Sequence, residues 1–489
     1  MKQTFSAEKL AEFYSKLNSS FIPQSSSFRT PVHVVYGGAH LFTAETPQKL
    51  GNIALKSLDE YAPNFLEFSK AMWLKGADIL PNYEDATRDL AYQFIEREEK
   101  LKRENFAAWF ALTVYRKTID KLRREPVEDF RIDFEDGYGF RTDAEEDEHC
   151  ISASDELAKI GARTTLSASD LRVGSPRSNL PFCGFRIKSF QKETFRRAVR
   201  TLDLFLTNLL EKTNGELPEH FVVTLPKIKQ REEVEILNEL LNEFEKQNSL
   251  ENGAIKIEIM IETPEAIVNE KGEINLRNLV EAGKGRVESA HFGAYDYTAS
   301  FGISGVHQHL RHEACNFARQ MMQISLAPLG IRLSDSVTTE MPIPVHKGID
   351  LSDKLLIQNK RAIHSAWRKH FNNVTNSLID GFYQSWDLHP AQFAARYAVV
   401  YSFFLDAKNE QAKRLKGFIE KATRAAMTGN VFDDAASANG LLNFFGQALN
   451  CGAIDKKEIL EITGLTENEL RSSSFMQIME NRRKVKTVP

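Results

Sequence analysis

Two acidic residues that close apolar, β-rich runs of this sequence have the chemistry of a metal site. Glu262 ends the run Ile255–Glu262, and Asp296 ends the run Val287–Asp296. Acidic residues are depleted in strands, and a buried charge requires a partner. Mg²⁺ prefers one or two carboxylates and completes its shell with water and substrate oxygens, whereas two carboxylates without a cation repel each other. The sequence therefore predicts that Glu262 and Asp296 bind Mg²⁺.

A further group of acidic residues follows the run Phe130–Glu135. The period of two in a strand places Asp133 and Glu135 on one side, opposite Phe134, and Asp136 comes next. A solvated acidic loop is the alternative interpretation. The strand that precedes the group favours a role at a site.

Two basic residues complete the set. Arg186 lies between Phe185 and Ile187, so it either pairs with an inward carboxylate or awaits an anionic ligand. Lys227 could hold a carboxylate, a thioester or a phosphate, or pair with an acidic neighbour. The sequence leaves the alternatives for both residues open.

These residues need a scaffold that brings separate strand ends together. Eight β-rich runs alternate with segments of helical periodicity, as expected of a (β/α)8 TIM barrel of the α/β class, whose chemistry lies at the carboxyl ends of its strands. An open doubly wound sheet is the alternative, but no Gly-rich nucleotide loop follows any run. The runs are Val32–Gly38, Phe130–Glu135, Cys183–Lys188, His220–Pro226, Ile255–Glu262, Val287–Asp296, Ile331–Val337 and Gly381–Asp387.

The same alternation predicts the domain organisation. We expect an N-terminal helical segment over 1–30, a catalytic barrel over 31–408 and a C-terminal helical extension over 409–489. A helical insertion is expected at about 45–125, between the first two strands. Thr263 and Pro264 should cap and open a helix directly after Glu262.

Composition excludes several functions. Lys and Arg number 63 against 67 Asp and Glu, a net charge of −4, which argues against nucleic acid or an anionic membrane as a partner. The sequence has no apolar run long enough to span a membrane and no signal-peptide pattern at its start. The four cysteines stand far apart, so neither a disulfide framework nor a zinc ribbon is expected, and a cytoplasmic location is the default.

Six short motifs together show a family resemblance. They are DFEDG at 133–137, GFRIKS at 184–189, LPKIK at 225–229, IETPEA at 261–266, FGAYDY at 292–297 and GFYQSWDLHPAQ at 381–392. In this order they resemble the citrate lyase beta-subunit-like branch of the HpcH/HpaI aldolase superfamily, which includes malyl-CoA lyases and, more distantly, malate synthases.

The resemblance implies roles for these residues. Glu262 and Asp296 would bind Mg²⁺, or Mn²⁺ in its place, and Arg186 would hold the carboxylate of a 2-oxo acid. Asp133 and Asp136 would lie beside the metal and the substrate. Glu135, in the same acidic motif, is a candidate to orient a catalytic water.

One candidate lies in the C-terminal extension. Some thioester-cleaving relatives use an aspartate in a similar context, which corresponds to Asp433 within Gly429–Asp433, with Asp434 adjacent. The alternative is that Asp433 or Asp434 only caps the following helix. Ser385, Trp386 and Asp387 depart from the usual family motif, which puts coenzyme-A contacts in doubt more than the metal site.

The predicted activity is a Mg²⁺-dependent carbon–carbon lyase or aldolase, or the reverse condensation, acting on a 2-oxo or 2-hydroxy acid. A coenzyme-A or acyl-carrier thioester is a candidate acyl partner, and homo-oligomers are expected because the family commonly forms them. Alternatives are an enzyme acting on a phosphorylated three-carbon acid such as phosphoenolpyruvate, and a regulatory barrel that keeps the metal site without turnover.

Overall fold

The computed structural model describes residues 8–9, 29–82, 84–164, 180–428, 435–471 and 474–486. The predicted helical segment 1–30 and the candidates Asp433 and Asp434 lie largely or wholly outside these ranges.

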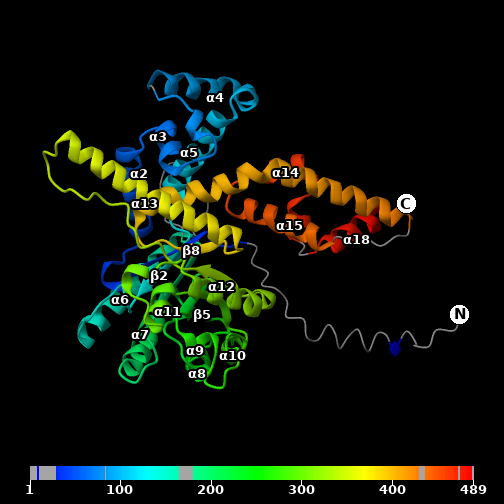
Figure 1. Cartoon of the computed structure of the whole chain (residues 1–489). Helices are drawn as coiled ribbons and strands as arrows, with labels where there is room; N and C mark the ends of the chain where they lie inside the picture. The colour runs from blue at the N-terminus through cyan, green and yellow to red at the C-terminus, as the bar shows by residue number, and fades with distance from the viewer. Residues whose placement is uncertain are drawn as a thin grey trace.

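Eight parallel strands form a closed barrel in sequence order, with β8 paired to β1, which confirms the predicted TIM barrel (Figure 1). The carboxyl ends of β1, β2 and β3 align, because Gly38 lies opposite Asp133 and Asp133 lies opposite Arg186. The strands are β1 (His33–Gly38), β2 (Asp129–Asp133), β3 (Phe182–Arg186), β4 (Phe221–Leu225), β5 (Lys256–Ile261), β6 (Val287–Phe292), β7 (Arg332–Asp335) and β8 (Gln384–Trp386).

All eight predicted runs contain a strand, but the sixth predicted run extends beyond the end of its strand. β6 ends at Phe292, and Asp296 lies in the first turn of helix α11 (Ala294–Ser300) rather than at a strand end. Gly293 leaves the extended conformation (φ −107°, ψ 85°) and turns the chain into that helix. Thr263 caps the short helix α9 (Pro264–Ile267) by accepting a hydrogen bond from the Ala266 amide, as predicted.

Helices cover the outside of the barrel and make up both additions to it. Those around the barrel are α6 (Asp143–Thr164), α7 (Phe195–Thr213), α8 (Arg231–Gln247), α9, α10 (Leu276–Ala282), α11, α12 (Glu313–Leu326) and α13 (Asp353–Ile379). Between β1 and β2 lie α2 (Thr46–Tyr61), α3 (Phe65–Met72), α4 (Glu84–Glu104) and α5 (Phe106–Arg124), which confirms the predicted helical insertion. Short 3-10 helices occupy Ala39–Leu41, Ala77–Ile79, Gly305–His307, Ala327–Leu329 and Pro390–Gln392.

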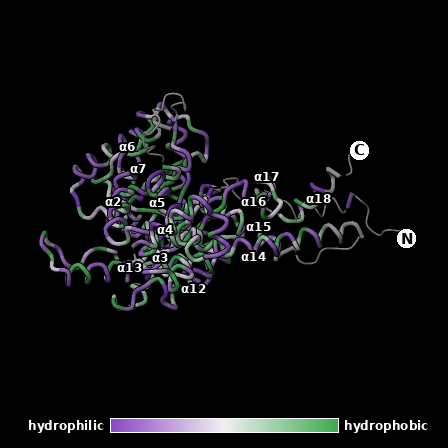
Figure 2. Tube along the Cα trace, turned by 90° about the horizontal axis from the view of Figure 1, so that it is seen from above, coloured by the Kyte–Doolittle hydropathy of each residue, from purple (hydrophilic) through white to green (hydrophobic). Residues whose placement is uncertain are grey.

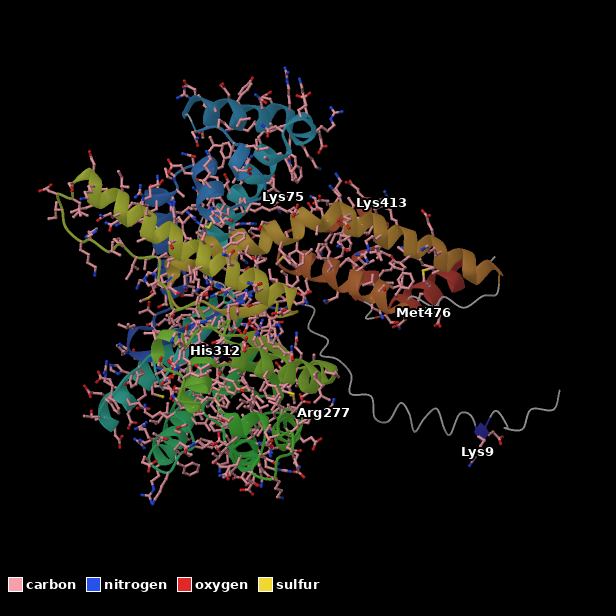
Figure 3. The ribbon with its side chains drawn as sticks, in the orientation of Figure 1. Lys9, Lys75, Arg277, His312, Lys413 and Met476 are labelled. Atoms are coloured by element: carbon pink, nitrogen blue, oxygen red, sulfur yellow. The ribbon has the colours of Figure 1, made fainter. Side chains whose placement is uncertain are left out.

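The C-terminal part is helical, as predicted, but its first helix begins inside the predicted barrel range. The long helix α14 starts at Phe393, after β8 and the short 3-10 helix Pro390–Gln392, and runs to Thr428 as the base of an arm that projects from the barrel (Figures 1 and 2). Lys75 anchors this helix to the insertion, because its ammonium lies 2.6 Å from the Asp406 carboxylate (Figure 3). The arm continues with α15 (Ala435–Asn450), α16 (Lys456–Thr463), α17 (Glu467–Arg471) and α18 (Phe475–Lys486).

Two features noted in the sequence, its hydropathy and its cysteines, can be compared with the structure. Among the described residues, no helix combines the length and apolar character needed to cross a membrane. All four cysteines are buried and free, in line with the absence of a disulfide framework.

A buried ion cluster joins β8 to α14 and β1. The Asp387 carboxylate accepts hydrogen bonds from Arg396 Nε and Nη2 (3.0 and 2.6 Å) and contacts His33 Nδ1 at 2.7 Å. His370 Nε2 on α13 lies 2.9 Å away. Burial opposes the charge of Asp387, but Arg396 and His370 hold its pKa well below the ordinary value.

This low pKa predicts an acid-sensitive fold. The aspartate side chain has a pKa of about 3.9 in an unfolded chain. The ionised native Asp387 therefore contributes stability above that pH, and this contribution is lost as the pH falls toward the lower pKa of the native state. We expect Asp387→Asn to cost about 3 kcal/mol at neutral pH, because Arg396 would lose its buried counter-charge. The free energy of unfolding should then depend less steeply on pH between about 2 and 5 than in the wild type.

Urea denaturation at several pH values measures both effects. Asp350→Asn is the control, because Asp350 is exposed. An unchanged pH slope in Asp387→Asn would contradict the assignment.

Candidate functional site

The predicted site residues converge at the carboxyl ends of β2 to β6. Asp133 and Arg186 are the last residues of β2 and β3. Lys227 follows β4 by two residues, and Glu262 directly follows β5. Asp296, which was predicted at a strand end, reaches the same place from the first turn of α11.

A buried ion pair between Asp133 and Arg186 forms the base of the site. Arg186 donates from Nε to Asp133 Oδ1 at 2.7 Å and from Nη2 to Oδ2 at 2.6 Å, a side-on bidentate pair. The two residues are 0% and 1% exposed. Burial opposes the charge of Arg186, but the carboxylates of Asp133 and Glu135 raise its pKa well above the ordinary value. Arg186 therefore pairs with an inward carboxylate, one of the two interpretations that the sequence left open.

The Asp133 carboxylate also holds the loop after β2. Its Oδ1 accepts from the Glu135 amide at 3.0 Å and its Oδ2 from the Gly137 amide at 2.7 Å. A Cβ on Gly137 would lie 2.6 Å from Oδ2, so glycine is required for this close approach. With four donors on its two oxygens, Asp133 positions other groups, and its direct contact with a substrate stays a prediction.

Lys227 bridges the acidic loop. Its ammonium pairs with Glu135 and lies 2.8 Å from Asp136 Oδ1. The remaining nitrogen of Arg186, Nη1, lies 3.3 Å from Glu135 and 3.6 Å from Asp136. Burial raises the pKa of Glu135 to about 7, whereas the hydrogen bond with Glu135 and the charges of Arg186 and Lys227 overcome burial and lower that of Asp136.

The backbone of Lys227 connects this loop to the predicted metal ligands. Lys227 adopts a left-handed conformation (φ 51°), which is uncommon for a residue with a side chain. Its amide donates to Glu262 Oε1 at 2.7 Å. One residue thus orients Glu262 through its amide and the acidic loop through its ammonium.

Glu262 and Asp296 lie side by side, as predicted. Burial and the neighbouring Asp296 carboxylate raise the pKa of Glu262 to about 8, and burial also raises that of Asp296 against the hydrogen bond it shares with Glu262. Glu262 is 1% exposed and Asp296 is half-buried. Two carboxyl groups this close share a proton or a cation. Among the described residues, no group of three or more His, Cys, Asp or Glu side chains is arranged to hold a metal.

An aromatic layer directly below Arg186 was not predicted from the sequence. The Arg186 guanidinium lies 4.9 Å from the Tyr36 ring and 6.0 Å from the Trp386 ring, and His291 contacts both aromatic rings. Neither ring nitrogen of His291, nor Trp386 Nε1, has a hydrogen-bond partner among the described residues. Burial lowers the pKa of His291 to about 4, so it is neutral at physiological pH. The sequence signal that could have indicated Tyr36, His291 and Trp386 was their position within β-rich runs.

A second ion cluster lies under the aromatic layer. Arg131 pairs with Asp129 and with Glu258, whose Oε2 lies 3.0 Å from Nη2. Tyr36 spans the two levels, because its hydroxyl donates to Glu258 Oε1 at 3.2 Å. The barrel interior is therefore charged above and below a ring layer rather than filled with aliphatic side chains.

These features define the class of protein as a closed eight-stranded parallel barrel with an acidic site at the carboxyl ends of its strands. A sequence-family model described as "Domain of unknown function (DUF6986)" matches residues 10–478. The chain belongs to that family. No curated protein matches the sequence.

Several solved structures are similar at low identity. A citrate lyase from Burkholderia xenovorans LB400 is 17% identical, with 68% of this chain and 87% of that chain covered and a TM-score of 0.43. The malate synthase of Haloferax volcanii in a magnesium and glyoxylate complex is 15% identical, with 56% and 65% covered and a TM-score of 0.38. The citrate lyase beta subunit of M. tuberculosis, complexed with oxaloacetate and magnesium, is 16% identical, with 59% and 92% covered and a TM-score of 0.32.

The contact between Gly293 and Glu262 gives a direct test of the site geometry. A Cβ at position 293 would lie 2.5 Å from both Cβ and Oε2 of Glu262, so Gly293→Ala must displace that carboxylate. We expect a loss of about 1–3 kcal/mol in the free energy of unfolding. Gly305→Ala is the matched control, because a Cβ there meets open space. Equal stability of the two variants in chemical denaturation would contradict the geometry.

Proposed function

We propose that this chain is a Mg²⁺-dependent carbon–carbon lyase or aldolase that acts on a small 2-oxo or 2-hydroxy acid. The observation that carries the proposal is the contact between Glu262 and Asp296 at the carboxyl end of the barrel, beside the cations Arg186 and Lys227. Two carboxyl groups beside two basic residues suit a substrate that is itself an acid. The oxygens of such a substrate could complete the coordination of a cation held by Glu262 and Asp296.

The residues present fit a Mg²⁺ ion. Glu262 is a buried carboxyl group with a raised pKa beside a second carboxyl group, an arrangement that a divalent cation stabilises. Glu262 and Asp296 would hold the ion, and water and substrate would supply the other oxygens. When bound, Mg²⁺ supplies Lewis acidity toward the substrate oxygen that changes charge.

The basic residues would hold the substrate carboxylate. The Nε and Nη2 edge of Arg186 is occupied by Asp133, so a substrate would meet Nη1, which lies among the weaker contacts to Glu135 and Asp136. Lys227 can exchange one of its two acidic partners for the substrate. Arg186 would then hold the substrate carboxylate through this one nitrogen.

In the cleavage direction, a carboxylate base removes the proton of the 2-hydroxyl group as its carbon becomes a carbonyl. The electron pair of the broken carbon–carbon bond passes to the leaving fragment as an enolate, which then takes a proton at carbon. By the family resemblance the base would be Asp433, which lies outside the described residues. Otherwise Glu135, half-buried beside Lys227, would orient a water that takes the proton.

The metal proposal predicts the effect of two substitutions. Glu262→Gln and Asp296→Asn each remove one charged oxygen ligand, and we expect each to weaken Mg²⁺ binding by at least about tenfold. Titration calorimetry with Mg²⁺, or electron paramagnetic resonance with Mn²⁺, measures the affinity. Glu265→Gln is the control, because Glu265 is exposed three residues beyond Glu262. Unchanged affinity in both site variants would refute the metal site.

The substrate class is tested with a panel of acids. We expect pyruvate, glyoxylate or oxaloacetate to bind more tightly with Mg²⁺ than without it, and carbon–carbon bond formation or cleavage to appear with a suitable acceptor, assayed in both directions with and without coenzyme-A thioesters. Arg186→Lys should weaken binding of the acid, because lysine cannot keep the bidentate pair with Asp133 and a contact to substrate at once.

The alternatives give different outcomes of the same panel. Mg²⁺-dependent binding of phosphoenolpyruvate in preference to the 2-oxo acids would indicate a phosphorylated three-carbon substrate. Tight Mg²⁺ and acid binding without turnover under any condition would indicate a regulatory barrel.

A further inference from the structure

A cavity lies at the opposite end of the barrel from the candidate site. Its volume is about 510 Å³, and it is lined where strands begin: by Arg332, the first residue of β7, by His220 before β4 and by Tyr383 before β8. Gln447 of α15 closes it from the C-terminal arm, so the barrel floor and the arm meet around this space.

Arg332 is the unusual residue of this cavity. It lies opposite Ser289 in the sheet, and its guanidinium lies 4.9 Å from the Phe182 ring, which also stacks on His220. Among the described residues it makes no hydrogen bond and no ion pair, and its Nε and Nη2 atoms are shielded from solvent without a partner. Burial lowers its pKa from the ordinary value. Arg332 as a whole is half-buried, but two of its guanidinium nitrogens lie away from water without a hydrogen bond, so its charge has no paired oxyanion among the described residues.

The acidic groups nearest to Arg332 do not fill that role. Asp129 and Glu258 in the barrel interior are both paired with Arg131. They balance the charge of Arg332 only from beyond ion-pair distance. Glu288 lines the cavity but makes no ion pair with Arg332. The other lining arginine, Arg29, pairs with Glu125 at 2.6 Å.

The remaining lining groups suit a hydrogen-bonding ligand. The Tyr383 hydroxyl accepts from Asn443 Nδ2 at 3.2 Å, which leaves its own proton to donate. The Gln447 side chain has no hydrogen bond among the described residues. A guanidinium stacked on a ring can still present its third nitrogen, Nη1, which is not among the shielded atoms, to an oxygen of a carboxylate or phosphate.

We infer that this cavity binds a small oxyanion, the carboxylate or phosphate group of a metabolite, between Arg332, Tyr383 and Gln447. The ligand would connect the barrel floor to α15 and so stabilise the arm against the barrel. This site is separate from the proposed active site and does not depend on its chemistry.

The test is titration calorimetry of the full chain with inorganic phosphate and, separately, with malonate, each against chloride at equal ionic strength. We expect saturable binding of at least one probe and a rise in the melting temperature with its concentration. Phosphate alone or malonate alone identifies which oxyanion the site prefers. No saturable binding of either probe would overturn the inference.

Variants locate the binding. Arg332→Gln should weaken it by about tenfold or more, through loss of the guanidinium charge. Gln447→Glu places a negative charge in the cavity and should weaken it by a similar factor, whereas the matched neutral change Gln447→Met, which removes only a hydrogen-bonding group, should weaken it by less. If Arg332→Gln does not fold, the two Gln447 variants decide. Equal binding in wild type, Arg332→Gln and Gln447→Glu would place the anion outside this cavity and refute the site.

Discussion

The bidentate pair of Asp133 with Arg186 is the interaction on which the site depends. It joins the last residues of adjacent strands, and the same carboxylate accepts the amides of Glu135 and Gly137. The acidic loop is thereby fixed against the guanidinium, Lys227 is held against the loop, and the Lys227 amide orients Glu262. Breaking one buried ion pair would release each of these contacts in turn, since every later group is positioned by the one before it.

The barrel interior explains how such a charged cluster can be buried. Two ion clusters, one around Arg186 and one around Arg131, are separated by the ring layer of Tyr36, His291 and Trp386. Each carboxylate of the lower cluster has a guanidinium partner, which offsets the cost of removing charge from water. Among the described residues, the carboxyl groups of Glu262 and Asp296 have no guanidinium partner of this kind.

Sequence reasoning found the members of the site better than their contacts. Asp133, Glu135, Arg186, Lys227 and Glu262 were predicted from charged residues next to β-rich runs, and all lie at one end of the barrel. The sequence left open whether Arg186 pairs with an inward carboxylate, since both Asp133 and a free ligand fitted. It did not indicate His291 or Trp386, whose residue types are ordinary in strands. The sequence did not indicate that Asp296 lies in the helix α11, because the apolar, β-rich pattern that ends with the strand at Phe292 continues without interruption as far as Tyr295.

What the sequence determined by itself is the alternation of strands and helices, the barrel it implies and the positions of the charged residues along the chain, because periodicity and strand-end composition are local properties. Tertiary structure alone decided which charges meet. The pairing of Asp133 with Arg186, the bridge by Lys227 and the unpaired Arg332 arise from closing the barrel, which brings together residues far apart in sequence. Coulomb and desolvation energies depend on those distances and on burial, and neither is present in a linear pattern.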